Sequence, residues 1–135
     1  MENAGAGGGA VQITKKGGRT PLESYDGREL YYVKGEDQVG ELWRVPVNGG
    51  EERLMMESVI NANFALAARG IYFIPKRDPD GFSIKFYNFA TGQTRRVAKV
   101  ANAEWGLTVS PDERWILHIQ VDNMHSNLML VENFR

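Results

Sequence analysis

Two histidines and one carboxylate between them are the residues of this chain best suited to hold a metal ion. His118 and His125 lie on either side of Asp122, and the sequence contains no cysteine. A zinc site would need these three groups and a further ligand gathered at one point. His118 instead alternates with Leu117 and Ile119 in a run typical of a strand. Packing explains this histidine without an ion, and we predict no metal site.

A second acidic motif, Asp78-Pro79-Asp80-Gly81, begins like a calcium-binding loop. Such a loop needs further acidic ligands and a closing bidentate glutamate, and the residues that follow supply neither. We interpret the motif as a turn between two strands. The glycine-rich opening of the chain likewise lacks the Gly-Lys-Ser/Thr ending of a phosphate-binding loop, so no cofactor is predicted.

Ser24 and Ser110 are the remaining candidate nucleophiles. Neither lies in a Gly-x-Ser-x-Gly elbow, and the sequence places no general base beside either serine. We interpret both as turn residues that shape the backbone. The sequence therefore predicts no catalytic residue and a protein that is not an enzyme.

The charge balance argues against several classes of partner. Sixteen Lys and Arg face seventeen Asp and Glu, giving a net charge of -1, so the chain has no basic field for nucleic acid. The small cluster of Arg95, Arg96 and Lys99 is interpreted as a solvated strand.

No apolar run approaches the roughly 20 residues of a membrane-spanning helix, so no membrane insertion is predicted. The lack of a signal peptide after Met1 favours the cytoplasm, and the periplasm stays open if the chain belongs to a longer protein.

The elements that position these residues are short strands separated by turns, and they recur. Ser24 to Arg28 and Ser110 to Arg114 share the pattern S-x-D-x-R, and their aspartates are 86 residues apart. Midway between them, Ala67 to Gly70 precedes a hydrophobic strand as the other two turns do. The spacing predicts a unit of about 43 residues with four short strands, which is the length and content of one β-propeller blade.

This unit predicts an all-β fold, a propeller fragment of three four-stranded antiparallel blades. A flexible Gly/Ala leader is expected over 1–10, followed by one module over 11–135. Within the module we expect a displaced strand and its linker at 11–19, blade 1 at 20–59, blade 2 at 60–103 and blade 3 at 104–135.

The third blade ends too early to form its own fourth strand. A spare strand lies upstream of the first blade, at Val11, Gln12, Ile13 and Thr14. Three blades are too few for a closed ring, because propellers usually carry four to eight. We therefore expect a homodimer that closes a six-bladed ring, in which each spare strand completes the third blade of the partner chain. A fragment of a longer propeller is the alternative.

Large rings recur at equivalent positions of the three units and are expected to fill the wedge between neighbouring blades. They are Tyr31, Tyr32, Trp43, Tyr72, Phe73, Phe86, Tyr87, Trp105 and Trp115.

The loops that join the second and third strands of each blade, and those that join successive blades, are expected to form one binding face. Rigid scaffolds commonly carry binding residues on such loops. Mixed charges there predict an unidentified protein partner. The candidate residues are Lys15, Lys16, Arg19, Glu36, Asp37, Lys76, Arg77, Asp78 and Asp122.

Three motifs together resemble the TolB-type, WD-like propeller repeat of bacteria. They are S-P-D-x-R at 110–114, G-R-x-L-Y-Y at 27–32 and L-W-R-V-P-V-x-G-G at 42–50. The resemblance covers about residues 11–135 and implies that Asp26, Gly27 and Asp112 shape tight turns; Glu113 replaces the glycine in the third repeat. The implied function is a scaffold for protein interaction and self-assembly. The alternatives are a sensory propeller domain of a larger bacterial regulator and a propeller hydrolase or lyase with a central site.

Overall fold

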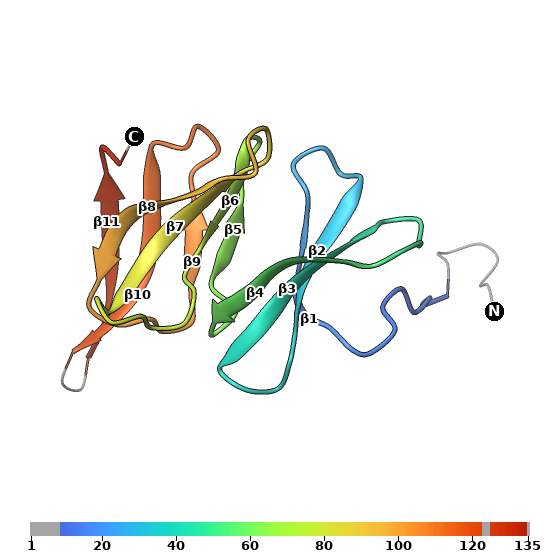
Figure 1. The fold of residues 1–135 in the computed structure, drawn as a ribbon, viewed down its shortest axis with the longest axis horizontal. Coiled ribbons are helices and arrows are strands. Elements are labelled where there is room, and N and C mark those ends of the chain that lie inside the picture. Colours follow the sequence, from blue (N-terminus) through green and yellow to red (C-terminus); the bar gives the residue numbers. More distant parts are fainter. Residues whose placement is uncertain (1–8, 123–124, 135) are drawn as a thin grey trace.

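The computed structural model describes residues 9–122 and 125–134 and contains three antiparallel sheets side by side (Figure 1). This part of the chain forms no helix, and so no helix that could cross a membrane. The prediction of an all-β fold is confirmed, and the arrangement is consistent with a propeller fragment. Residues 1–8 of the expected leader lie outside the described residues.

Each sheet is a meander of strands that follow one another in the sequence. The first sheet contains β1 (Arg19–Glu23), β2 (Glu29–Lys34), β3 (Val39–Pro46) and β4 (Arg53–Ile60). The second contains β5 (Phe64–Leu66), β6 (Gly70–Phe73), β7 (Phe82–Asn88) and β8 (Thr94–Val100). The third contains β9 (Leu107–Val109), β10 (Trp115–Asp122) and β11 (His125–Glu132). The third sheet thus has three strands among the described residues, with β11 at its edge.

The S-x-D-x-R motifs form the same turn in the first and third sheets. Ser24 Oγ donates to Asp26 Oδ1 at 2.7 Å, and the Arg28 backbone N–H donates to that carboxylate at 3.0 Å. Ser110 and Asp112 repeat the first bond at 2.8 Å. Both serines therefore cap turns, as predicted.

One position of this turn needs a left-handed backbone. Gly27 adopts φ +74° there at little cost, whereas Glu113 adopts φ +58° at the equivalent place in the third sheet. A non-glycine residue in this region is strained by about 1–2 kcal/mol. Contacts of the Glu113 side chain offset that strain, as described below.

Buried side chains from the first and second sheets form one core. They are Tyr31, Val33, Leu42, Met56 and Val59 from the first sheet and Phe64, Ile71 and Phe73 from the second. Each fully buried side chain of this size contributes roughly 1.5–3 kcal/mol.

The opposite face of the second sheet forms a second core with the third sheet. Successive residues of a strand point to opposite faces, so Ile71 and Phe73 serve the first core, whereas Tyr72 and Ile74 serve the second. All four residues of β6 are buried. The second sheet is therefore apolar on both faces.

An ion pair between a half-exposed arginine and a buried glutamate joins the second and third sheets at the end that carries the S-x-D-x-R turns. The guanidinium of Arg69 contacts the Glu113 carboxylate at 3.0 Å, and the Tyr72 hydroxyl donates to the same carboxylate at 2.8 Å. Arg69 also lies over the ring of Phe86, with Cζ 5.4 Å from the ring centre. The ring of Phe134 packs edge-on against Tyr72 at 5.7 Å. These contacts close that end of the second core.

Asparagine side chains link the segment that enters the second sheet to the segment that enters the third. Asn63 Nδ2 donates to the Glu104 carbonyl at 2.6 Å, and its Oδ1 accepts from the Gly106 N–H at 2.9 Å. Asn61 Nδ2 donates to the Ala103 carbonyl at 2.6 Å. The entries to the second and third sheets are thus bonded to each other.

Two of the predicted packing rings are exposed in this chain. Trp105 is 54% exposed and lies beside the Arg19 guanidinium, and Trp115 is 50% exposed. Because Ile116 points into the second core, Trp115 points to the opposite face of the third sheet, where the described chain supplies no further sheet. Tyr31, Tyr32, Tyr72, Phe73 and Phe86 are buried.

We predict that Glu113→Ala lowers the free energy of unfolding by about 1–3 kcal/mol, because the buried Tyr72 hydroxyl loses its acceptor. Glu113→Gly should cost about 1 kcal/mol less than Glu113→Ala, since glycine relieves the left-handed strain at this position. Urea titration followed by tryptophan fluorescence measures both variants. Equal stability of Glu113→Ala and the parent chain would contradict this account.

A second prediction concerns His118, which is buried in the second core with Nδ1 unpartnered. Burial lowers the pKa of His118 below the usual 6.5, so the folded state favours the neutral ring. The preference for the neutral ring contributes fully to the free energy of unfolding above pH 6.5, the usual pKa of the side chain. This contribution is lost as the pH falls through the lower pKa of His118 in the folded chain. Replacing the ring by leucine should flatten the fall in stability between pH 7 and about pH 5. An unchanged slope in His118→Leu would show that other groups cause the fall.

Candidate functional site

Five residues of the predicted loop face lie together near the start of β1. Arg19 binds the turn between β2 and β3: its Nε donates to the Gly35 carbonyl at 2.8 Å and its Nη2 to the Asp37 carbonyl at 2.9 Å. Lys16 and Glu36 line a depression of about 230 Å³ beside it. The backbone N–H of Lys15 donates to the Glu52 carboxylate at 3.1 Å. Arg19 therefore holds the linker against the turn, while the other side chains face solvent.

The remaining predicted residues lie on the other two sheets. Lys76, Arg77 and Asp78 belong to the connection between β6 and β7, where the Lys76 N–H donates to Ser58 Oγ at 2.8 Å. Asp78 accepts from the Asp80 N–H at 2.8 Å, which closes the turn. Asp122 ends β10. Figure 1 shows the connections after β2 and β6 and the end of β10 at one end of the molecule.

The predicted assembly strand, Val11 to Thr14, forms no strand within this chain. It lies close to the outer face of the first sheet, the face turned away from the second sheet, since Thr14 and Tyr32 both approach Gly18. Ile13 and Thr14 are half-buried, whereas Val11 is exposed.

That outer face of the first sheet is aromatic and carries one buried charge cluster. Tyr32, Trp43 and Leu54 are directly paired across β2, β3 and β4 and so share this face. The Glu52 carboxylate accepts from the Tyr32 hydroxyl and contacts Lys34 Nζ at 3.1 Å. Lys34 Nζ also lies 4.3 Å from the ring centre of Trp43.

The outer face of the third sheet is apolar and open. Leu117 pairs with Leu130, and Ile119 pairs with Leu128, on the face opposite Ile116. Leu128 is 74% exposed and Leu130 is 49% exposed. Because β11 is the edge strand, one row of its backbone N–H and C=O groups also has no neighbouring strand among the described residues. The third sheet thus ends in a free edge and an uncovered face.

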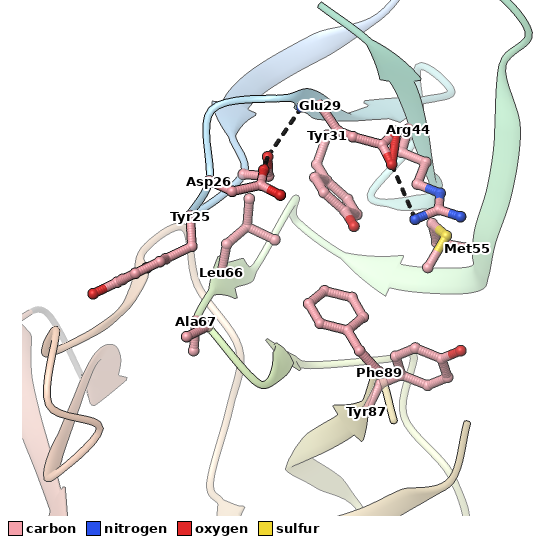
Figure 2. Close-up of a pocket in the computed structure, with 12 residues that line it drawn as sticks. Tyr25, Asp26, Glu29, Tyr31, Arg44, Met55, Leu66, Ala67, Tyr87 and Phe89 are labelled. Atoms are coloured by element: carbon pink, nitrogen blue, oxygen red, sulfur yellow. Dashed lines mark hydrogen bonds and ion pairs between the residues drawn. The ribbon is translucent and has the colours of Figure 1, made fainter. Parts of the chain in front are cut away.

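A cleft of about 370 Å³ opens between the first and second sheets, at the end of the molecule that carries the S-x-D-x-R turns (Figure 2). Tyr31 and Arg44 line it from the first sheet, and Leu66, Tyr87 and Phe89 line it from the second. Figure 2 shows the Tyr31 ring directed across the cleft toward the ring of Phe89. The rings of Tyr87 and Phe89 meet edge-on at 6.1 Å.

The polar groups of the cleft are two carboxylates, one guanidinium, the Ser24 hydroxyl and three phenols, of which that of Tyr31 belongs to a buried side chain. Arg44 Nη1 contacts Glu29 Oε1 at 3.2 Å, so these two charges offset each other. Hydrogen bonds from the Arg28 N–H and from Ser24 lower the pKa of Asp26, which keeps its carboxylate charged at neutral pH. Burial raises the pKa of Tyr31, partly opposed by a hydrogen bond with Arg44, which keeps the phenol neutral.

This arrangement suits binding more than proton transfer. The lowered pKa of Asp26 makes its carboxylate a weaker base, and the raised pKa of Tyr31 makes its phenol a weaker acid. In the part of the chain that the structure describes, no three His, Asp or Glu side chains are grouped to hold a metal ion. The cleft therefore presents the faces of aromatic rings and a net negative charge to a ligand.

Sequence reasoning did not single out this cleft. Tyr31 was expected to pack between blades, and Asp26 to shape a turn; both statements hold, and both residues also line the cleft. The one available signal was the replacement of the S-x-D motif by Ala67 and Ala68, which removes side-chain bulk from one wall.

No protein-family model and no curated protein matches this sequence. Among solved structures, the chain is similar to the crystal structure of TolB from Acinetobacter baumannii, with a TM-score of 0.41 and 12% sequence identity. The match covers 87% of this chain and 41% of that one, so the chain spans less than half the length of that structure.

Proposed function

We propose that this chain is a non-enzymatic propeller scaffold that functions in protein interaction through self-assembly. The observation that carries the proposal is the end of the third sheet, where a free strand edge and an uncovered apolar face coincide. Exposed edges pair readily with another strand, and apolar patches of this kind mark interaction sites.

A second copy of the chain supplies a matching surface. The outer face of the first sheet presents the exposed Leu54 and the half-buried Trp43, and the charge of Glu52 is already compensated by Lys34. Stacking this face on the Leu128 and Leu130 face of another copy repeats the sheet-on-sheet packing of the two cores within the chain. Two such interfaces close a ring of six sheets with two-fold symmetry.

The segment from Val11 to Thr14 completes this assembly as an added edge strand. It precedes β1 and lies on the first sheet's outer face, the side on which the partner's third sheet stacks. From there it can pair with the partner's β11, which has a free edge in the described chain. Backbone hydrogen bonds to β11 then replace those that water makes in the single chain.

Light scattering should therefore give a mass close to twice the 15.2 kDa of one chain. Leu128→Asp should weaken the dimer at least about 100-fold, because a carboxylate is buried against an apolar face. Removing residues 11–14 should weaken it as well. Phe89→Ser, which changes an exposed ring away from both outer faces, is the matched control and should leave the mass unchanged. A stable monomer at all concentrations would refute the assembly.

The loop face is proposed as the surface for an unidentified protein partner. Lys76 and Arg77 are exposed, and the Lys76 contact to Ser58 uses only its backbone N–H. The double substitution Lys76→Ser, Arg77→Ser should thus change the free energy of unfolding by less than about 0.5 kcal/mol. In affinity pull-downs, the double variant should capture less of the proteins that the parent chain retains. Equal capture by both chains would exclude these two side chains from the partner surface.

A further inference from the structure

The two inter-sheet cores end differently at the turn-bearing end of the molecule. The second core ends in the Arg69 guanidinium, held between the Phe86 ring and the Glu113 carboxylate. A second guanidinium, that of Arg95, lies 5.5 Å from the centre of the same ring. Cations thus seal that core through ring faces and a turn carboxylate.

The first core ends in the open cleft of Figure 2 with the same kinds of groups around it. Tyr31 occupies the position in β2 that Tyr72 occupies in β6, and each points into the core on the side of the following sheet. The turn carboxylate is Asp26, and the additional rings are Tyr87 and Phe89. Phe89 is 40% exposed.

The second core has two guanidinium groups at its end, those of Arg69 and Arg95, whereas this cleft has one. Arg44 is the one basic residue in its lining, and its charge is offset by Glu29. With Asp26 charged, the lining carries a net negative charge beside ring faces, which are themselves electron-rich.

We infer that the cleft between the first and second sheets binds an organic cation, a guanidinium or ammonium group such as an arginine side chain of a partner, between the rings of Tyr31 and Phe89 and near Asp26. The group adds a second cation at the end of the first core, as Arg95 does at the end of the second. An anion is disfavoured, because the charge of Asp26 would repel it while that of Glu29 is offset by Arg44. The cleft volume of about 370 Å³ holds a single side chain or a small molecule.

This inference goes beyond the assembly proposal and does not depend on it. The cleft lies between the first two sheets, whereas assembly uses the outer faces of the first and third sheets. Binding of a small probe and the mass in solution are therefore separate measurements.

The test uses three probes, followed by NMR chemical shifts on the full chain. Acetyl-arginine methylamide should bind with a dissociation constant of about 0.1–10 mM, as expected for one cation and a few rings. Tetramethylammonium tests whether the ligand can be a free organic cation. Binding of both cationic probes would show that the cleft accepts any cation of this size. Binding of the arginine probe alone would show that it requires a planar guanidinium. Acetyl-glutamate methylamide should not bind. No saturable shift with either cation, or tighter binding of the glutamate probe, would overturn the inference.

Matched variants locate the site. Asp26→Asn should weaken binding of the arginine probe at least about fivefold, since it removes the negative charge near the cation. Asp112→Asn changes the same position of the same turn in the third sheet, away from the cleft, and should leave binding unchanged. Phe89→Ala should also weaken binding, and this exposed position keeps the test decisive if Asp26→Asn disturbs its turn. Equal loss of binding in Asp26→Asn and Asp112→Asn would overturn the assignment.

Discussion

Face-to-face packing of apolar sheets is the interaction on which this structure depends. The second sheet shows it most fully, because β6 and the residue after it bury Ile71 and Phe73 on one side and Tyr72 and Ile74 on the other. A sheet with two apolar faces needs two neighbours, and a row of three sheets always leaves two faces uncovered. The third sheet exposes Leu128 and Leu130 for this reason, and the first sheet presents Trp43 and Leu54. The free edge of β11 adds unpaired backbone groups at the same end.

Departures from the repeat pattern have local physical reasons. Glu113 occupies a left-handed position that suits glycine, yet its carboxylate binds Arg69 and the Tyr72 hydroxyl. Arg69 itself lies in the shortened turn of the second repeat, so the irregular turns of two repeats meet in one ion pair. Gly70 is required for a different reason, because a Cβ there would lie 1.9 Å from the Tyr87 carbonyl oxygen. The closed second core and the open first core follow from these few substitutions.

Local patterns were sufficient to predict the strands, their turns and the short third sheet. Ser24 and Asp26, or Ser110 and Asp112, are two residues apart and form their bonds within one turn, so the sequence alone reveals them. The cleft and the ion pair depend on sheet stacking instead. Tyr31 and Phe89 line the same cleft, and Arg69 contacts Glu113, although the residues of each pair are more than forty positions apart in the sequence. No local sequence pattern reveals such long-range neighbours. The exposure of Trp115 was missed for the same reason, since it depends on which face of the last sheet has no neighbour.

The central claim is that the edge and outer face of the third sheet are covered when the chain functions. Amide hydrogen exchange along β11 tests it most directly, because the N–H groups that point away from β10 have no strand partner among the described residues. We predict that these amides become protected as the protein concentration rises, while β6, which is buried within each chain, keeps the same protection throughout. Fast exchange along this edge at every concentration would contradict the account.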